Sequence, residues 1–133
     1  MRIFLLVFTF CLLLPVPPAA AQEPASLNLR RGHYREVPSI VWNTPGLSVL
    51  DLSKNPLTGL PDSIARLPLT HLILQKTYVT DFPASVKDSP LSRSLELLDM
   101  RGCRMTEGQQ DSIRNLFPDT KILWDFPCEC GAD

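Results

Sequence analysis

The sequence predicts an α/β solenoid, and three observations support this prediction. Three stretches of the 133-residue chain align with one another, namely LSVLDLSKNPL at 47–57, LTHLILQKTYV at 69–79 and LELLDMRGCRM at 95–105. A second signature, in which an apolar residue and a proline precede a β-branched residue, also recurs three times, at 37–40, 60–64 and 82–86. Finally, the first leucines of the three stretches lie 22 and 26 residues apart, a period typical of stacked repeats.

The spacing of the leucines within one stretch indicates a short strand followed by a turn. Alternating side chains of a strand point to opposite faces, so Leu50 and Leu52 share one face. One repeat cannot bury its apolar set alone, and neighbouring repeats therefore have to stack. We expect successive parallel strands at 49–52, 71–74 and 97–100. An ordinary α/β domain with apolar strands is the alternative, but it does not explain three aligned copies.

All three stretches fit L-x-x-L-x-L-x-x-[N/T/C]-x-L, with large apolar residues at the four leucine positions, and here the sequence resembles the leucine-rich-repeat family. The proline signature is similar to the LPxxI return path of small exported bacterial members. The resemblance implies a leucine-rich-repeat solenoid of about five short repeats, with a parallel β-sheet on the concave face. It also implies that Asn55, at the ninth position, hydrogen-bonds the backbone of its turn, with Thr77 and Cys103 in its place in the next two repeats.

The two ends of the chain fit partial repeats. Leu27 and Leu29 match an opening repeat, and Ile122 and Trp124 match a closing one. The stretch 111–124 resembles the helical return and final strand of bacterial members. The predicted repeats lie near 25–46, 47–68, 69–94, 95–118 and 119–127, with a cysteine-containing tail at 128–133.

Residues 1–21 have the features of a secretory signal peptide. A short positive start precedes an apolar run at 3–14, and small residues at 19–21 favour cleavage before Gln22. The run is shorter than the roughly 20 apolar residues that span a bilayer, and no later segment is long enough either. We therefore expect one exported domain, 22–133, without a transmembrane segment after cleavage. Periplasm, cell surface and medium all remain open.

Export makes a disulfide plausible, because exported proteins meet oxidising conditions. Cys128 and Cys130 are too close along the chain to bridge one another easily. Stacking brings both near Cys103, so we predict a disulfide from Cys103 to Cys128 or Cys130. The alternative is three reduced thiols, with Cys103 as a small buried residue. His33 and His71 are not placed to complete a metal site with these cysteines, and we expect no metal.

The outward positions of the strands supply the candidate contacts with a partner. The third, fifth and seventh positions give Asn28, Arg30, Asp51, Ser53, His71, Ile73, Gln75, Asp99 and Arg101. The eighth position adds Arg31, Lys54 and Lys76 along one edge. Such a mixture of acidic, basic and apolar residues is typical of a binding face, although an ordinary solvated strand face has the same composition.

The sequence does not favour an enzyme, and we expect no catalytic residue and no cofactor. Asp51 and Asp99 lie two repeats apart, about 10 Å at the usual strand spacing, which is too far to share a proton. A Ser53–His71–Asp99 trio would stand on an open sheet without an oxyanion hole. The sequence also contains no Gly-rich phosphate loop.

The composition and the ends of the repeat array bear on the choice of partner. The formal net charge of −1, with no strongly basic stripe, argues against nucleic acid. The resemblance implies a module that binds a protein, or else a glycan, and the alternative is a structural envelope-associated domain without a specific ligand. The uncapped first strand also leaves an edge through which the protein could self-associate.

Overall fold

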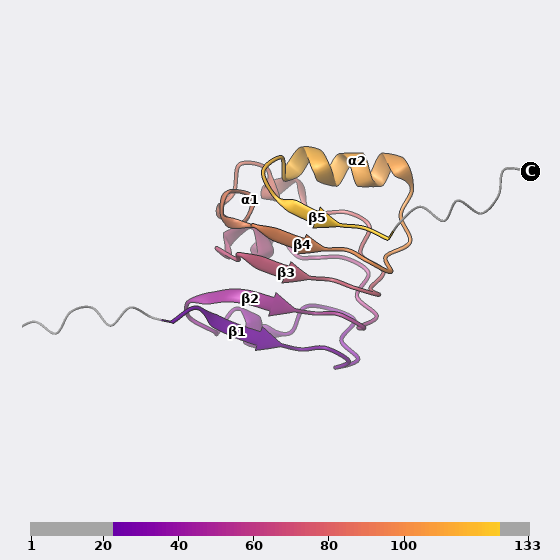
Figure 1. The fold of residues 1–133 in the computed structure, drawn as a ribbon. Helices are drawn as coiled ribbons and strands as arrows, with labels where there is room; N and C mark the ends of the chain where they lie inside the picture. Colours follow the sequence, from indigo (N-terminus) through magenta and orange to yellow (C-terminus); the bar gives the residue numbers. More distant parts are fainter. Residues whose placement is uncertain (1–22, 126–133) are drawn as a thin grey trace, which may run out of the picture.

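The computed structural model describes residues 23–125, which form one parallel sheet backed by short helices (Figure 1). The strands follow one another in chain order, with bounds β1 Ala25–Asn28, β2 Leu47–Asp51, β3 His71–Ile73, β4 Leu97–Asp99 and β5 Lys121–Leu123. Leu50, Leu72 and Leu98 are register partners across the three central strands. The predicted solenoid with a parallel sheet is confirmed.

The return segments pass behind the sheet as short helices. Three are 3₁₀ helices, at Ser39–Val41, Asp62–Arg66 and Ala84–Val86, and two are α-helices, α1 at Pro90–Ser94 and α2 at Glu107–Leu116. A proline precedes each 3₁₀ helix, which suits a residue without an N–H because the first helical amides have no intrahelical partner. The recurring proline signature therefore marks the start of each return helix. Helix α1 was not foreseen from the sequence.

The first return helix differs from the alignment made on the sequence. That alignment placed Ile40 with Ile64 and Val86, but the backbone N–H that bonds back to the proline carbonyl belongs to Val41 in the first repeat. Val41 is fully buried, as Ile64 and Val86 are, whereas Ile40 is 48% exposed. The buried β-branched residue thus lies three positions after the proline in each of these three repeats, because one 3₁₀ turn brings that position back toward the sheet.

The core is the stack of inward leucines predicted from the repeat pattern. Leu50, Leu72 and Leu98 are fully buried, and so are Leu52 and Leu74. A polar column at the ninth position closes this core on the side of the turns. Asn55 Nδ2 donates to the carbonyls of Leu29 and Leu52 at 2.9 and 2.8 Å, and Thr77 Oγ1 donates to the carbonyl of Leu74 at 2.8 Å.

The two tryptophans are only partly buried. Trp42 is 36% exposed, and Trp124, which matched the closing repeat, is half-buried with the Arg114 guanidinium 5.6 Å from its ring centroid. Both stand at the ends of the array formed by residues 23–125, where the described sheet continues on one side only. In residues 23–125 no helix has the length and apolar character needed to cross a bilayer.

Candidate functional site

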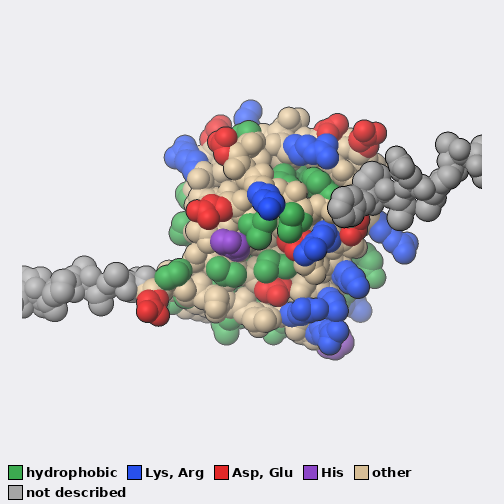
Figure 2. Space-filling view, in the orientation of Figure 1, with side chains coloured by type: hydrophobic (Ala, Val, Ile, Leu, Met, Phe, Trp, Pro, Cys, Tyr) green, Lys and Arg blue, Asp and Glu red, His purple; other side chains and the backbone are tan. Residues whose placement is uncertain are grey.

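The open face of the sheet carries two rows of side chains in register. The first row runs through Val49, His71 and Leu97, and the second through Asp51, Ile73 and Asp99. Hydrophobic side chains gather near the middle of this face, and Lys and Arg side chains gather toward its lower right edge (Figure 2). The third and fifth positions of the three central repeats therefore lie in register on the same side of the sheet.

Three of the polar residues on this face have a structural task at the strand ends. The side-chain oxygens of Asn28, Asp51 and Asp99 accept the backbone N–H two residues later, at 3.1, 2.9 and 3.2 Å. Asn and Asp favour such local turns, because a short side chain reaches its own backbone two residues on. Sequence reasoning assigned these residues to partner binding alone. The recurrence of Asn or Asp at the fifth position was the signal for the turn.

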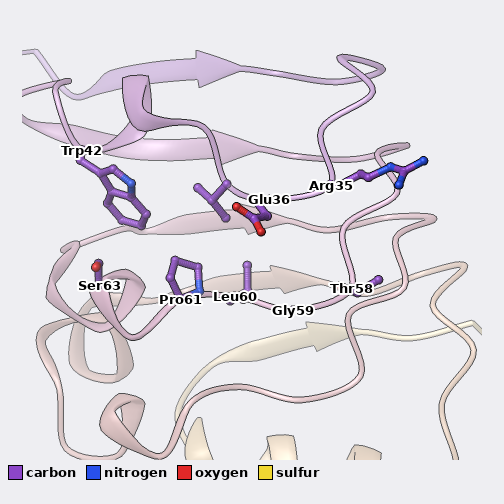
Figure 3. A pocket seen from close by; sticks show the side chains of 9 residues that line it. Arg35, Glu36, Trp42, Thr58, Gly59, Leu60, Pro61 and Ser63 are labelled. Atoms are coloured by element: carbon purple, nitrogen blue, oxygen red, sulfur yellow. The ribbon is translucent and has the colours of Figure 1, made fainter.

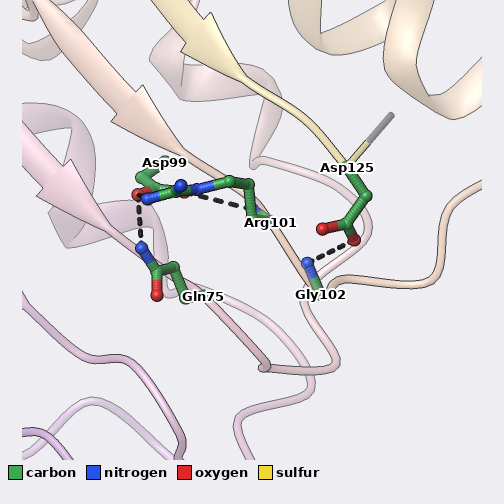
Figure 4. A network of polar contacts seen from close by, with 5 residues as sticks. All are labelled: Gln75, Asp99, Arg101, Gly102 and Asp125. Carbon is green, nitrogen blue, oxygen red and sulfur yellow. Dashed lines mark hydrogen bonds and ion pairs between the residues drawn. The ribbon is translucent and has the colours of Figure 1, made fainter. Parts of the chain in front are cut away.

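Asp99 is also the centre of a polar network (Figure 4). Arg101 donates Nε to Oδ1 at 3.0 Å and an Nη to Oδ2 at 2.7 Å, and Gln75 Nε2 donates to the same Oδ2. Burial by itself raises the pKa of Asp99, but the hydrogen bonds from Arg101 and Gln75 outweigh it, so the pKa lies below its ordinary value. The network joins the turn after β3 to strand β4 and ties the Arg101 guanidinium to the Asp99 carboxylate.

Burial divides the predicted contact residues into two groups. Ser53 and Asp99 are only 1% and 4% exposed, so their side chains offer little surface to a partner. Asn28, Arg30 and Arg101 are exposed, and the remaining members are half-buried, namely Asp51, His71, Ile73 and Gln75. The accessible face therefore combines an apolar centre with a few charged side chains around it.

The residues considered for catalysis make their contacts elsewhere. Asp51 and Asp99 are separated by Ile73 in the register, two strand spacings or about 10 Å apart. His71 Nδ1 lies 3.0 Å from Thr70 Oγ1, and Asp99 is bonded to Arg101 and Gln75, so neither His71 nor Asp99 is directed at the other. No group of three His, Cys, Asp or Glu residues between 23 and 125 is placed to hold a metal ion.

Cys103 is buried at the ninth position of the fourth repeat. Its thiol donates to the carbonyl of Leu74 at 3.0 Å and lies 3.4 Å from Thr77 Oγ1. Cys103 is therefore a member of the polar column at the ninth position. Cys103 is a free thiol among the described residues. Cys128 and Cys130 lie outside those residues, so the predicted disulfide stays a prediction.

A hollow of about 460 Å³ lies on the return side, between the first two repeats (Figure 3). Its lining combines the Trp42 indole and Pro61 with two adjacent charged residues, Arg35 and Glu36. Sequence reasoning did not single out this place, because the residues come from the return segments of two different repeats.

Comparison with known proteins agrees with the repeat pattern. The Leucine Rich Repeat family profile matches residues 46–67 and 94–116. The chain therefore carries leucine-rich repeats, and its fold is that of a small leucine-rich-repeat solenoid. Its structure is similar to that of a leucine-rich-repeat protein of Leptospira interrogans, with a TM-score of 0.58 and 27% sequence identity over 66% of this chain.

The match covers 22% of the Leptospira protein, so the chain spans about a fifth of the length of that relative. No match is found among curated proteins. Leucine-rich-repeat domains typically bind other proteins and are usually non-catalytic, and the open sheet described above fits that use.

Proposed function

We propose that this leucine-rich-repeat protein is an exported, non-catalytic binding module that holds a partner protein on the open face of its sheet. The observation that supports this most is the apolar centre of that face. Val49, Ile73 and Leu97 stand on three successive strands and remain partly exposed. A contiguous apolar patch rimmed by polar groups is the usual character of a protein-binding surface.

The polar groups around the patch favour specific binding over non-specific hydrophobic association. The Asp99–Arg101 pair and the Asp51 turn fix polar groups at the border of the patch, with 2.7 Å between Arg101 and Asp99. Fixed polar groups lose little conformational freedom when a partner binds, and this favours affinity. Arg101 is exposed and Arg residues are enriched in binding hot spots, so its guanidinium is the best-placed charged contact.

Site-specific photocrosslinking tests the proposal. A photoreactive residue in place of Ile73 or Leu97 is compared with one in place of Ser63, which is exposed on the return side. We expect one protein from envelope or host extracts to crosslink from positions 73 and 97 but not from position 63. Ile73→Glu should abolish its capture, whereas Ser63→Glu should not.

The competing function is a structural, envelope-associated domain without a specific ligand. That alternative predicts equal crosslinking from both sides of the molecule, or none. It also predicts that Ile73→Glu leaves the location of the protein in the cell unchanged. Fractionation of cells that carry the wild-type chain tests export at the same time.

A further inference from the structure

Four basic residues gather where the first three strands end in turns. We call this set, Arg30, Arg31, Lys54 and Lys76, the basic ridge. Its members at the eighth repeat position, Arg31, Lys54 and Lys76, share a left-handed backbone with φ of 59°, 56° and 53°. The backbone N–H of each donates to the next repeat, at 3.1, 2.8 and 2.8 Å. The three residues are thus stacked at about one strand spacing, roughly 4.8 Å per repeat.

The charges of the ridge are not neutralised within the described chain. The ion pairs found between residues 23 and 125 are Arg101–Asp99 and Arg114–Asp111, and neither includes a ridge residue. The pKa of Lys54 lies below its ordinary value, first because of Arg31 and then because of Arg30, with burial and Lys76 adding to the effect. Like charges held together in this way oppose folding.

The turn itself does not require a basic residue. In the fourth repeat Gly102 occupies the same position with a φ of 77°. A Cβ at Gly102 would lie 2.6 Å from Lys76 Cγ, so glycine leaves room for the lysine stem to extend along the ridge. The left-handed region is also unfavourable for most L-residues, so placing Arg31, Lys54 and Lys76 there destabilises the fold. An anionic ligand that binds the three cations would explain why they occupy these positions.

An exposed aromatic ring lies beside the ridge. Tyr78 is 68% exposed and contributes to two adjacent hollows that share Lys76 with it. The first, of about 390 Å³, also includes Lys54, and the second, of about 310 Å³, includes Arg104. A phenol ring between cationic side chains offers an apolar face and positive groups within one short stretch of surface.

The backbone hydrogen bonds at the basic ridge indicate which class of anionic ligand can bind there. The amides of Lys54, Lys76 and Tyr78 are already used inside the fold, so a peptide strand finds few main-chain partners here. A membrane surface needs a larger apolar area than one tyrosine ring to hold a protein. We propose that the basic ridge and Tyr78 bind an acidic polysaccharide, with its sulfate or carboxylate groups on the cations and a sugar ring on Tyr78.

Binding to heparin, used as a sulfated probe, tests this assignment with the purified protein. Lys54→Gln combined with Lys76→Gln should weaken binding about tenfold or more, since each charge near an anionic ligand contributes roughly fivefold. The same double variant should unfold at no lower temperature than the wild type, because like-charge repulsion is relieved. Tyr78→Ala should weaken binding without changing the salt dependence, which depends on the number of charges.

The matched control is Lys87→Gln combined with Arg93→Gln, which removes two exposed positive charges on the return side. This control, and Ile73→Glu on the sheet face, should leave heparin binding within about twofold of wild type. The assignment is overturned if the control weakens binding as much as the ridge variant does. It is also overturned if an anionic vesicle, a polyglutamate peptide or a single-stranded oligonucleotide binds more tightly than heparin at equal ionic strength.

Discussion

The two ends of the solenoid differ in how the last repeat is covered. At the C-terminal end, Ile113 of helix α2 and Phe117, the residue that follows the helix, are buried, and Phe117 meets Phe82 in an edge-to-face contact with 5.1 Å between ring centroids. At the N-terminal end, Leu27, Leu29 and Val37 are only partly buried, and β1 pairs with β2 on one side alone among the described strands. The same repeat pattern therefore yields unequal stability, because each repeat depends on its neighbours.

Truncation of a leucine should reduce stability more in the centre of the array than in its first repeat, and this is the largest effect that we expect. Leu72→Ala removes a fully buried side chain and should cost about 2–5 kcal/mol of unfolding free energy, enough to unfold so small a domain. Leu27→Ala, at the partly buried first strand, should cost clearly less. Urea unfolding of both variants measures the difference, and equal costs would mean that the first repeat is as well packed as the centre.

The predicted disulfide would add a covalent constraint to the C-terminal end alone. A bond from Cys103 to Cys128 or Cys130 closes a loop worth about 3 kcal/mol in the chain-entropy model. Peptide mapping without reductant, on protein recovered from the periplasm or medium, reports the pairing. If all three thiols react with an alkylating reagent in the unfolded protein, the disulfide is absent and Cys103 is only a buried member of the polar column.

Hydrogen exchange measures the openness of the first repeat directly. We expect the amides of residues 25–31 to exchange at least tenfold faster than those of 71–74, because local opening of an edge strand is less costly. The comparison is made on the monomer, with size measured at several concentrations. Protection that rises with concentration would support self-association through β1, and equal protection in a monomer would show that the edge is already covered.

The capping box of helix α2 contributes to the better-covered end. Thr106 Oγ1 accepts the Gln109 N–H at 3.3 Å, and the Gln109 side chain accepts the Thr106 N–H at 2.9 Å. Thr106→Ala should therefore lower the unfolding free energy by about 1 kcal/mol. Ser112→Ala, on the exposed side of the same helix, is the control and should have a smaller effect. A neutral result for both variants would place the stability of this end in the contacts of Phe117.

The Asp99 network should make stability depend on acid pH. The folded pKa of Asp99 is lowered, so its contribution is complete above the ordinary pKa of about 3.9 and is lost as the pH falls through the folded value. Wild type should lose stability in acid more steeply than Asp99→Asn. Asp111→Asn, on an exposed pair, should follow wild type, and identical pH profiles for all three proteins would mean that the network contributes nothing.

The sequence by itself determined the repeat and its buried face. The leucine spacing predicted the three central strands and the column Leu50, Leu72 and Leu98, because a period of two residues fixes which side chains share a face. The partial repeats at the two ends indicated the first and last strands. The repeat pattern also identified the polar column at the ninth position, which includes Asn55. The frame of the first return helix was wrong by one residue, since adjacent Ile40 and Val41 fit the signature equally well and only packing against the sheet distinguishes them.

Only the tertiary structure decided how the outward residues behave. Asp51, Ser53 and Asp99 were equal candidates in the sequence, but the turns draw the aspartates into backbone hydrogen bonds and bury Ser53. The basic ridge likewise combines residues more than 20 positions apart, brought together by a turn that repeats once per strand spacing. The local sequence pattern determines on which face of the sheet a side chain lies. Its contacts with side chains of neighbouring strands depend on how the repeats stack.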